Sequence, residues 1–285
     1  MKRILTKEIL QKYYSSYFSL EPLIKVIGIS KFQNREFGFL LIDNGNERFI
    51  RNMSFKTPSE LVKFMALTGV KGAYVGAMYD PPPRPSLSVT KLKWIGRELI
   101  FDLDLTDYDD IRTCGKGKDH VCPKCWPLVA NAAMFLDETL KDDFGFKKIY
   151  WFFSGRRGFH AWVADDITRT FDEEVREAIV SYISPEEHEK NVLPLAYQKR
   201  ALKIYTKTKL TDTMLRKQFK SEIEKIWSEL MNKLPRIDKK VTIDRVRLLR
   251  VPGSVHNATG KIVTEVKDLE SFYPDDAPDI WSIMV

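Results

Sequence analysis

Hydrophobic and polar positions along the N-terminal part of this chain predict alternating helices and strands. Apolar residues at helical spacing predict a short helix over 6–18, with Ile9, Tyr13, Tyr14 and Phe18 on its apolar face. Strand-like segments follow at 37–41, 49–53 and 72–78, and a helix is expected over 59–66, capped by Ser59 after Pro58. Helices and strands in this order predict a mixed α/β fold.

The second half of the chain continues the pattern. Pro127 stands at an expected helix start, and strands are expected at 149–153 and 159–163. Residues 184–234 are lysine-rich and helical, and 241–251 is interpreted as a returning strand. The helical segment carries one apolar stripe, interpreted as core packing: Leu215, Phe219, Ile223, Trp227, Leu230 and Leu234.

The segment 98–110, ELIFDLDLTDYDD, is a strand with acidic residues where apolar ones are expected. Its two faces are Leu99, Phe101, Leu103 and Leu105, against Ile100, Asp102 and Asp104. Asp102 and Asp104 are then roughly 6–7 Å apart along the strand. Two carboxylates this close resist ionising together without a cation, and their oxygens suit Mg²⁺ or Mn²⁺. A sheet edge with solvated acids is the alternative.

A two-metal site needs a further carboxylate from elsewhere in the chain. Asp238 and Asp244, in PRIDKKVTIDRVRLLR, are both candidates. Asp107, Asp109 and Asp110 follow the acidic strand into a turn, and we interpret them as solvated loop acids.

Basic residues supply a candidate anion site. In SGRRGFH, two glycines bracket Arg156 and Arg157, so the backbone, both guanidinium groups and the Ser154 hydroxyl can approach a phosphate, and His160 can add a donor. The alternative is a glycine-rich hairpin turn with surface arginines. A later group, Arg245, Arg247, Arg250 and His256, either holds the same substrate or pairs with acids and solvent.

The three cysteines cluster as Cys114, Cys122 and Cys125, which favours a metal site over disulfides and indicates an intracellular protein. With His120 they provide four ligands, as in a closed structural zinc site. Reduced thiols in a loop are the alternative.

Composition sets the remaining limits. A 44% hydrophobic content is typical of a folded globular protein, and a net charge of +7 favours a polyanionic partner such as nucleic acid. No apolar run approaches the roughly 20 residues that span a bilayer, and the first residues carry scattered charges, unlike a secretory signal. We therefore expect no membrane partner.

Several of these motifs occur together in a known order. ELIFDLDLTDYDD, CPKCW, DDFGFKKIYWFFSGRRGFHAWV and PRIDKKVTIDRVRLLRVPGSVHNATGKI, with YYSSYF and REFGF before them, resemble the small catalytic subunit of archaeal and eukaryotic DNA primase. The resemblance extends to about Ile262, and the short helical segment is more similar to archaeal members.

The resemblance implies a discontinuous mixed-sheet primase core, residues 1–183 and 235–285, with a zinc-binding motif at 111–126 and a helical insertion at 184–234. It also implies that Asp102, Asp104 and Asp238 bind the catalytic Mg²⁺ or Mn²⁺. The nucleotide-binding residues that it implies are Ser154, Arg156, Arg157, His160, Arg247, Arg250 and His256.

The implied activity is the synthesis of short RNA primers on single-stranded DNA from NTPs, with dNTPs as a further possible substrate. The implied partner is a large subunit with an iron–sulfur cluster, in the cytoplasm or nucleoid of an archaeon.

Three other functions fit parts of the sequence. FDLDLT imitates the DxDxT signature of metal-dependent phosphatases, in which the first Asp is a nucleophile. A repair-type primase-polymerase would share the same acids. A non-catalytic nucleic-acid module would use basic strands and aromatic residues, but Asp102 and Asp104 would repel its phosphates.

Overall fold

The computed structural model describes residues 3–43, 45–184, 194–206 and 230–284. Within them the helices are α1 (Lys7–Ser16), α2 (Glu21–Ile27), α3 (Pro58–Thr68), α4 (Trp126–Asp142), α5 (Glu173–Ile183), α6 (Leu195–Thr206), α9 (Lys239–Ile243) and α10 (Ile280–Ile283). The strands are β1 (Arg35–Asp43), β2 (Asn46–Met53), β3 (Gly72–Asp80), β4 (Lys93–Gly96), β5 (Leu99–Asp104), β6 (Ile149–Phe153), β7 (Gly158–Val163) and β8 (Leu249–Arg250). Short 3-10 turns are η1 (Phe32–Asn34), η2 (Val89–Lys91), η3 (Leu105–Tyr108), η4 (Asp166–Thr170) and η6 (Pro274–Asp276).

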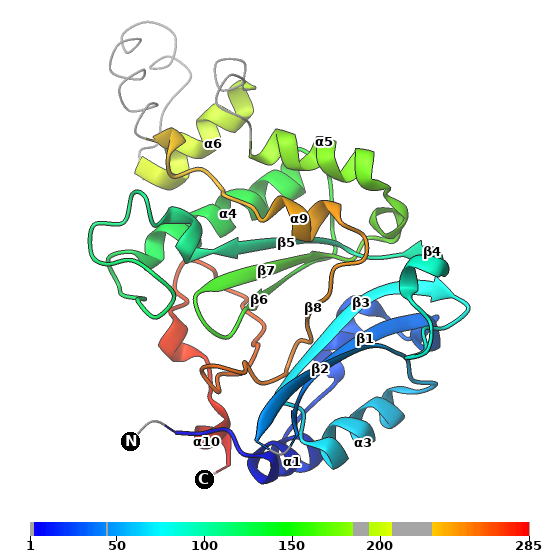
Figure 1. The fold of residues 1–285 in the computed structure, drawn as a ribbon. Coiled ribbons are helices and arrows are strands. Elements are labelled where there is room, and N and C mark those ends of the chain that lie inside the picture. Colours follow the sequence, from blue (N-terminus) through cyan, green and yellow to red (C-terminus); the bar gives the residue numbers. More distant parts are fainter. Residues whose placement is uncertain (1–2, 44, 185–193, 207–229, 285) are drawn as a thin grey trace, which may run out of the picture.

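The strands form two antiparallel sheets. The larger has the order β2-β1-β3-β4, with β8 also paired to β3, and the smaller has the order β5-β7-β6. Figure 1 shows the smaller sheet beneath α4, α5 and α9, while α1 and α3 cover the outer side of the larger sheet. The mixed α/β class predicted from the sequence is confirmed.

Each sheet has its own apolar core. Leu99, Phe101 and Leu103 of β5 are fully buried against α4 and α5. Ile100, on the other face of β5, belongs to the core that α1 and α3 form with the larger sheet. The period-2 alternation of the acidic strand is therefore confirmed, and Asp102 and Asp104 share the face of Ile100.

Several expected boundaries hold, and one cap is different. Thr6 caps α1 by accepting a hydrogen bond from Ile9 N, and β6 has the predicted bounds. Helix α3 is capped by Thr57, which accepts from Glu60 N, because Pro58 takes the first helical position. The prediction that Ser59 caps this helix was wrong.

The expected strand over 241–251 was also wrong for most of its length. Asp238 accepts hydrogen bonds from the backbone N–H groups of Lys240 and Val241, which start the helical turn α9. Only Leu249 and Arg250 pair as a strand, with Val75 and Tyr74 of β3. β-branched residues favoured a strand in the sequence, but local capping favours the helix here.

The helical insertion predicted at 184–234 lies partly outside the described residues. The described part contains α6, and Leu234 is buried with Phe135 and Tyr197. Leu215, Phe219, Ile223 and Trp227 of the predicted stripe lie outside the described residues, and the domain division stays a prediction.

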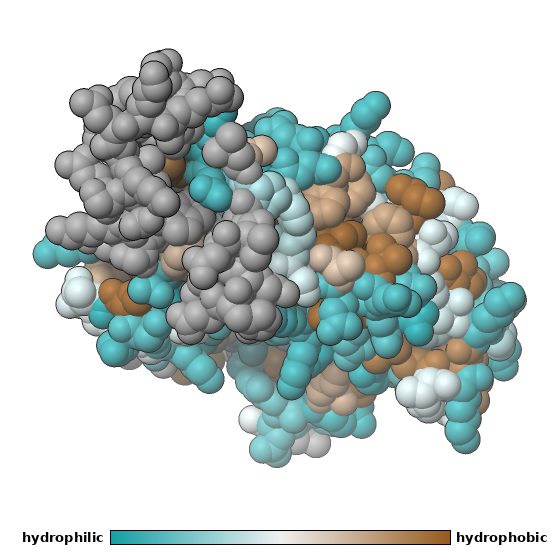
Figure 2. Space-filling model, turned by 90° about the horizontal axis from the view of Figure 1, so that it is seen from above, coloured by the Kyte–Doolittle hydropathy of each residue, from teal (hydrophilic) through white to brown (hydrophobic). Residues whose placement is uncertain are grey.

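Within the described residues, no helix is both long and apolar enough to cross a membrane. Figure 2 looks down on the helical layer and shows apolar side chains gathered beside the grey residues. Ile167 of η4 and Val175 of α5 are among the exposed apolar residues of the chain, at 63% and 40% exposure.

Candidate active site and metal centre

The acidic residues lie on β5, which is the open edge strand of the smaller sheet. Its neighbour β7 pairs Asp102 with His160 and Asp104 with Gly158. On the free side, Ile237 bridges Leu103, and the Asp238 backbone N–H donates to Asp102 O at 3.1 Å. Backbone pairing thus brings Asp238 beside the acidic pair, although it is far away in the sequence.

These carboxylates line one cavity of about 430 Å³, together with Thr106, Asp107 and the segment 237–240. Burial, then Asp104 and Asp238, raise the pKa of Asp102 to about 8. Partial desolvation by the cavity walls, then the same two neighbours, raise the pKa of Asp107 to about 6. A site that crowds anionic oxygens in this way fits a divalent cation, which would reverse these shifts.

The side chain of Asp104 is held by three hydrogen bonds. Its Oδ1 atom accepts from Thr106 N at 2.8 Å, from Thr106 Oγ1 at 2.7 Å and from Arg157 Nε at 2.6 Å. Thr106 was not among the residues predicted from the sequence, although its position in FDLDLT two residues after Asp104 is typical of such a turn. The remaining oxygen of Asp104 is therefore presented in a fixed direction.

The loop between β6 and β7 is a tight hairpin turn that contains Arg156 and Arg157. Ser154 N donates to Gly158 O at 2.9 Å, which closes the turn. A Cβ atom on Gly158 would lie 2.0 Å from Leu103 O, and Gly155 has φ +92° and packs on His256. Both positions therefore require glycine.

The structure brings His160, Arg250 and His256 to the same side as this loop. Burial and Arg250 lower the pKa of His160 to about 3, and burial, Arg250, Arg156 and Arg157 lower that of His256 to about 2. Both imidazoles are thus neutral near pH 7. The guanidinium carbon of Arg250 lies 5.2 Å from the centre of the Tyr74 ring, and its Nη2 donates to Asn257 Oδ1. Its buried Nη1 has no hydrogen-bond partner within the described residues.

The other predicted residues differ in position. Arg156 pairs with the exposed Asp119 of the cysteine-bearing loop. Arg247 is half-exposed, and its Nε lies 3.6 Å from the carboxylate of Asp244, so among the described residues it pairs with an acid outside the group of His160, Arg250 and His256. Asp244 accepts from Val246 N and lies outside the acidic cavity.

The acids that follow β5 are only partly the solvated loop acids predicted. Asp110 is exposed and pairs with Arg236, and Asp107 is exposed but contributes to the acidic cavity. Asp109 is half-buried, pairs with the buried Arg112 and accepts from Gly117 N. Arg112 also donates to His120 O, so Asp109 and Arg112 fix the cysteine-bearing loop.

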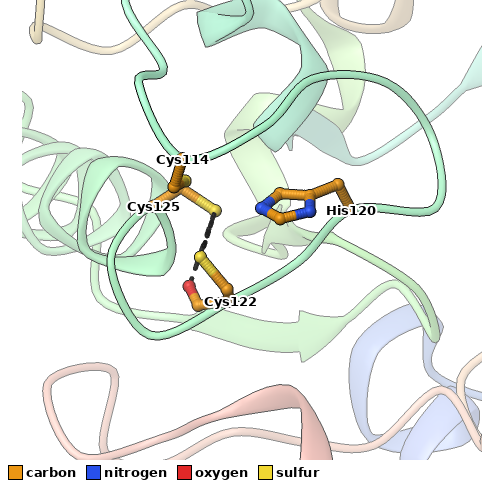
Figure 3. A group of neighbouring side chains, drawn as sticks. All are labelled: Cys114, His120, Cys122 and Cys125. Atoms are coloured by element: carbon orange, nitrogen blue, oxygen red, sulfur yellow. Dashed lines mark hydrogen bonds between the residues drawn. The ribbon is translucent and has the colours of Figure 1, made fainter.

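Cys114, His120, Cys122 and Cys125 converge in that loop, with all ligand atoms within 4.8 Å of one another (Figure 3). The Cys122 and Cys125 sulfurs are 3.7 Å apart, close to the roughly 3.8 Å expected when two Zn–S bonds of about 2.3 Å meet at a tetrahedral angle. His120 Nε2 is buried and lacks a hydrogen-bond partner within the described residues. The four side chains therefore fit a tetrahedral metal ion.

Comparison with known proteins agrees with this arrangement. The family model described as DNA primase small subunit matches residues 101–268. The DNA primase small subunit of Schizosaccharomyces pombe is 38% identical over 174 residues, which cover 60% of this chain and 37% of the relative. The DNA primase small subunit PriS of Archaeoglobus fulgidus is 29% identical over 290 residues, which cover 95% of this chain and 83% of the relative.

A solved structure shares the fold. The polymerase domain from Mycobacterium tuberculosis Ligase D in complex with DNA has a TM-score of 0.52 and 12% sequence identity, covering 98% of this chain and 88% of that chain. This likeness concerns the arrangement of helices and strands alone. The chain spans less than half the length of the S. pombe relative that it matches.

Proposed function

This chain belongs to the DNA primase small subunit family, and we propose that it makes short RNA primers on a single-stranded DNA template by nucleotidyl transfer from NTPs. The observation that carries this proposal is the shared cavity of Asp102, Asp104 and Asp238, with Arg157 of the loop between β6 and β7 donating to Asp104. Fixed carboxylates beside fixed arginines suit a reaction that joins a metal-bound phosphate to a hydroxyl.

In this reaction a 3′-hydroxyl oxygen forms a bond to the α-phosphorus, the bond to the pyrophosphate leaving group breaks, and the hydroxyl proton is lost to solvent. Asp102, Asp104 and Asp238 would hold Mg²⁺ or Mn²⁺, which supplies Lewis-acid activation of the hydroxyl and charge neutralisation on the phosphates. The three hydrogen bonds to Asp104 keep its free oxygen aimed into the cavity. Preorganised ligands of this kind lower the reorganisation needed in the transition state.

The triphosphate would be bound by a basic group that consists of Arg156, Arg157, His160, Arg250 and His256. Arg156 and Arg157 offer planar guanidinium groups to the β- and γ-phosphates, and Arg250 has a buried nitrogen free to donate. His160 and His256 are neutral, so each contributes a hydrogen-bond donor rather than a charge. His256 Nδ1 accepts from Ala258 N, which leaves its Nε2 as the donor.

Three further parts of the proposal rest on the family and on the cysteine–histidine cluster. Zn²⁺ bound by Cys114, His120, Cys122 and Cys125 would have a structural role, because four protein ligands leave no open position. A large subunit with an iron–sulfur cluster would be the protein partner, and dNTPs a second substrate class. The site of action would be the interior of the cell.

A phosphatase of the DxDxT type is not favoured. Its first Asp must act as a nucleophile, whereas Asp102 lies 3.7 Å from His160 and next to two further acids. The smaller sheet is antiparallel, and the match to the primase family begins at residue 101, within the acidic strand.

The deciding experiment incubates the chain with single-stranded DNA, NTPs and Mn²⁺ or Mg²⁺, and resolves the products by length. We expect template-dependent oligonucleotides that Asp102→Asn and Asp104→Asn abolish. Phosphate release from a small phosphomonoester without template, lost in the same variants, would contradict the proposal.

A further inference from the structure

Helix α9, which begins after Asp238, is too short to be stable alone. It has five residues, whereas isolated helices need on the order of a dozen residues to persist in water. Asp238 caps its first turn, and its place beside Asp102 is set by one backbone hydrogen bond and one bridge to β5, with Arg236 just before it bonded to Tyr108, Asp107 O and Asp110. The far end of α9 must therefore be fixed by other parts of the chain.

Arg176 of α5 supplies part of that support. Its side chain is fully buried, and Nη1 donates to Glu98 O at 3.2 Å and to Thr242 O at 3.3 Å. Nη2 donates to Arg97 O at 2.7 Å and to Thr168 O at 3.3 Å, and Nε donates to Phe171 O at 3.0 Å. One guanidinium group thus joins α9 to the residues from which β5 starts.

Arg97, immediately before β5, contacts the same end of α9. It is fully buried, and its Nη1 donates to Val241 O at 2.8 Å and to Asp244 O at 3.2 Å. The final carbonyl groups of a helix lack partners within the helix and carry partial negative charge, so cations suit them. Arg97 and Arg176 satisfy these groups from two directions.

Arg97 and Arg176 are two buried cations that lie close together, which is electrostatically unfavourable. Burial and then Arg176 lower the pKa of Arg97 to about 9, which shows that the two cations repel each other. The buried carboxylate of Glu98 is engaged by Arg35 at 2.8 Å and by Arg169 at 3.0 Å. A chain that only needed packing here could use apolar residues at lower cost.

We propose that Arg176 and Arg97 are positioning residues that hold α9 so that Asp238 completes the carboxylate site with Asp102 and Asp104. The proposal rests on the proposed function, because it assigns the arginines to the metal-binding acids of that reaction. Neither arginine touches the metal or substrate, and both act through the place of Asp238.

The test measures Mn²⁺ binding by titration calorimetry on the full chain, without nucleotide. Arg176→Lys keeps the charge but loses the fork that reaches two segments, so we expect the Mn²⁺ dissociation constant to rise about tenfold. In the primer assay, kcat should fall by at least about tenfold, while KM for NTP changes less than about twofold.

A double-mutant cycle separates positioning from general stability. Where Asp238→Asn has already removed the third ligand, Arg176→Lys should change Mn²⁺ affinity less than about twofold. Arg35→Lys is the matched control, because Arg35 is equally buried in the same region but donates to Glu98 and Gly76 O. It should lower the melting temperature and leave Mn²⁺ affinity within about twofold.

Arg97→Lys gives a second variant if Arg176→Lys does not fold, with an expected rise of about tenfold in the Mn²⁺ dissociation constant, because Arg97 donates to two carbonyl groups at the end of α9. Unchanged Mn²⁺ affinity in the folded variants, equal loss in Arg35→Lys, or the same effect of Arg176→Lys with and without Asp238→Asn would each overturn the proposal. If the unmodified chain neither binds Mn²⁺ nor extends a primer, the proposed function itself fails.

Discussion

The carboxylate cavity and the cysteine–histidine cluster are separated by few residues in the sequence, but they prepare their ligands differently. The side chains of Asp102 and Asp104 are 27% and 30% exposed and lie close to other acidic side chains. Strand pairing sets their positions, and the negative charge of the site is left unbalanced. The four ligands of the cluster come from one loop, which Asp109 and Arg112 fix. The acids line a cavity that a substrate can enter, whereas the cluster is closed in the sense that its four ligands leave a metal ion no open position.

The hydrogen bonds within the cluster also differ from those around the acids. Backbone N–H of Cys125 and the Cys114 thiol lower the pKa of Cys122, while the hydrogen bond with Cys122 raises the pKa of Cys114, so local hydrogen bonds favour one thiolate in the cluster. In contrast, burial and neighbouring acids raise the pKa of Asp102. The comparison teaches that the ligands of a structural metal site can be arranged by local hydrogen bonds. The proposed catalytic site instead depends on acidic residues that distant segments bring together.

The largest expected effect removes a carboxylate from the open site. Asp102→Asn or Asp104→Asn keeps the shape but deletes a charge, so primer synthesis should fall by about 10³-fold or more. The melting temperature of metal-free Asp102→Asn should stay the same or rise, because repulsion is relieved, whereas that of Asp104→Asn should not rise, because the ion pair with Arg157 is lost. Product analysis and thermal denaturation check this, and equal activity in Asp102→Asn would remove the distinction between the two sites.

A smaller effect is expected on the basic side of the cavity. Arg157→Ala removes a bond to Asp104 as well as the proposed phosphate contact, so both kcat and KM for NTP should worsen, together by about 10²-fold in kcat/KM. Arg156→Ala is the control, since Arg156 contacts Asp119 instead, and it should raise KM alone. Steady-state kinetics on both variants decide whether the two neighbouring arginines differ.

Disruption of the closed site should have a different outcome. Cys122→Ser with Cys125→Ser should lose about one equivalent of zinc and lower the melting temperature, because metal binding contributes to folding. Nucleotide binding by the folded fraction should persist within about threefold, since the basic group lies on other elements. Metal analysis and nucleotide titration are the measurements, and full zinc content in the variant would show that these cysteines are not ligands.

The smallest effect concerns the contact that joins the two regions. Asp119→Asn releases Arg156 from an exposed ion pair, and such pairs contribute little, so NTP affinity should rise by about twofold or less at low salt. The gain should disappear at high ionic strength. A loss of affinity instead would mean that Asp119 orients Arg156 for the phosphate.

The sequence was sufficient where a pattern is local. Alternation in ELIFDLD predicted the faces of β5, and cysteine spacing predicted the convergent cluster, because neighbouring residues determine both. Asp238 could not be separated from Asp244 by spacing, since pairing along the open edge of β5 decides which one reaches the cavity. The resemblance to primases made that choice.

Other features were hidden because they depend on distant partners. Helix α9 was mistaken for a strand, as the buried arginines that satisfy its carbonyl groups come from α5 and from the start of β5. Arg247 shared a predicted role with Arg250, but only Arg250 pairs with β3 and reaches the histidines. A nucleotide-binding role for Arg247 stays a prediction.

Asp238 pairs with the edge of β5 but is synthesised well after it. A ribosome delivers β5 and the arginine loop long before Asp238, Arg250 and His256 leave the exit tunnel. During that interval the edge of β5 is uncovered and the acidic pair lacks its third member. A nascent chain of this protein can therefore fold its cysteine loop early, whereas its carboxylate site is completed only after Asp238 has been synthesised.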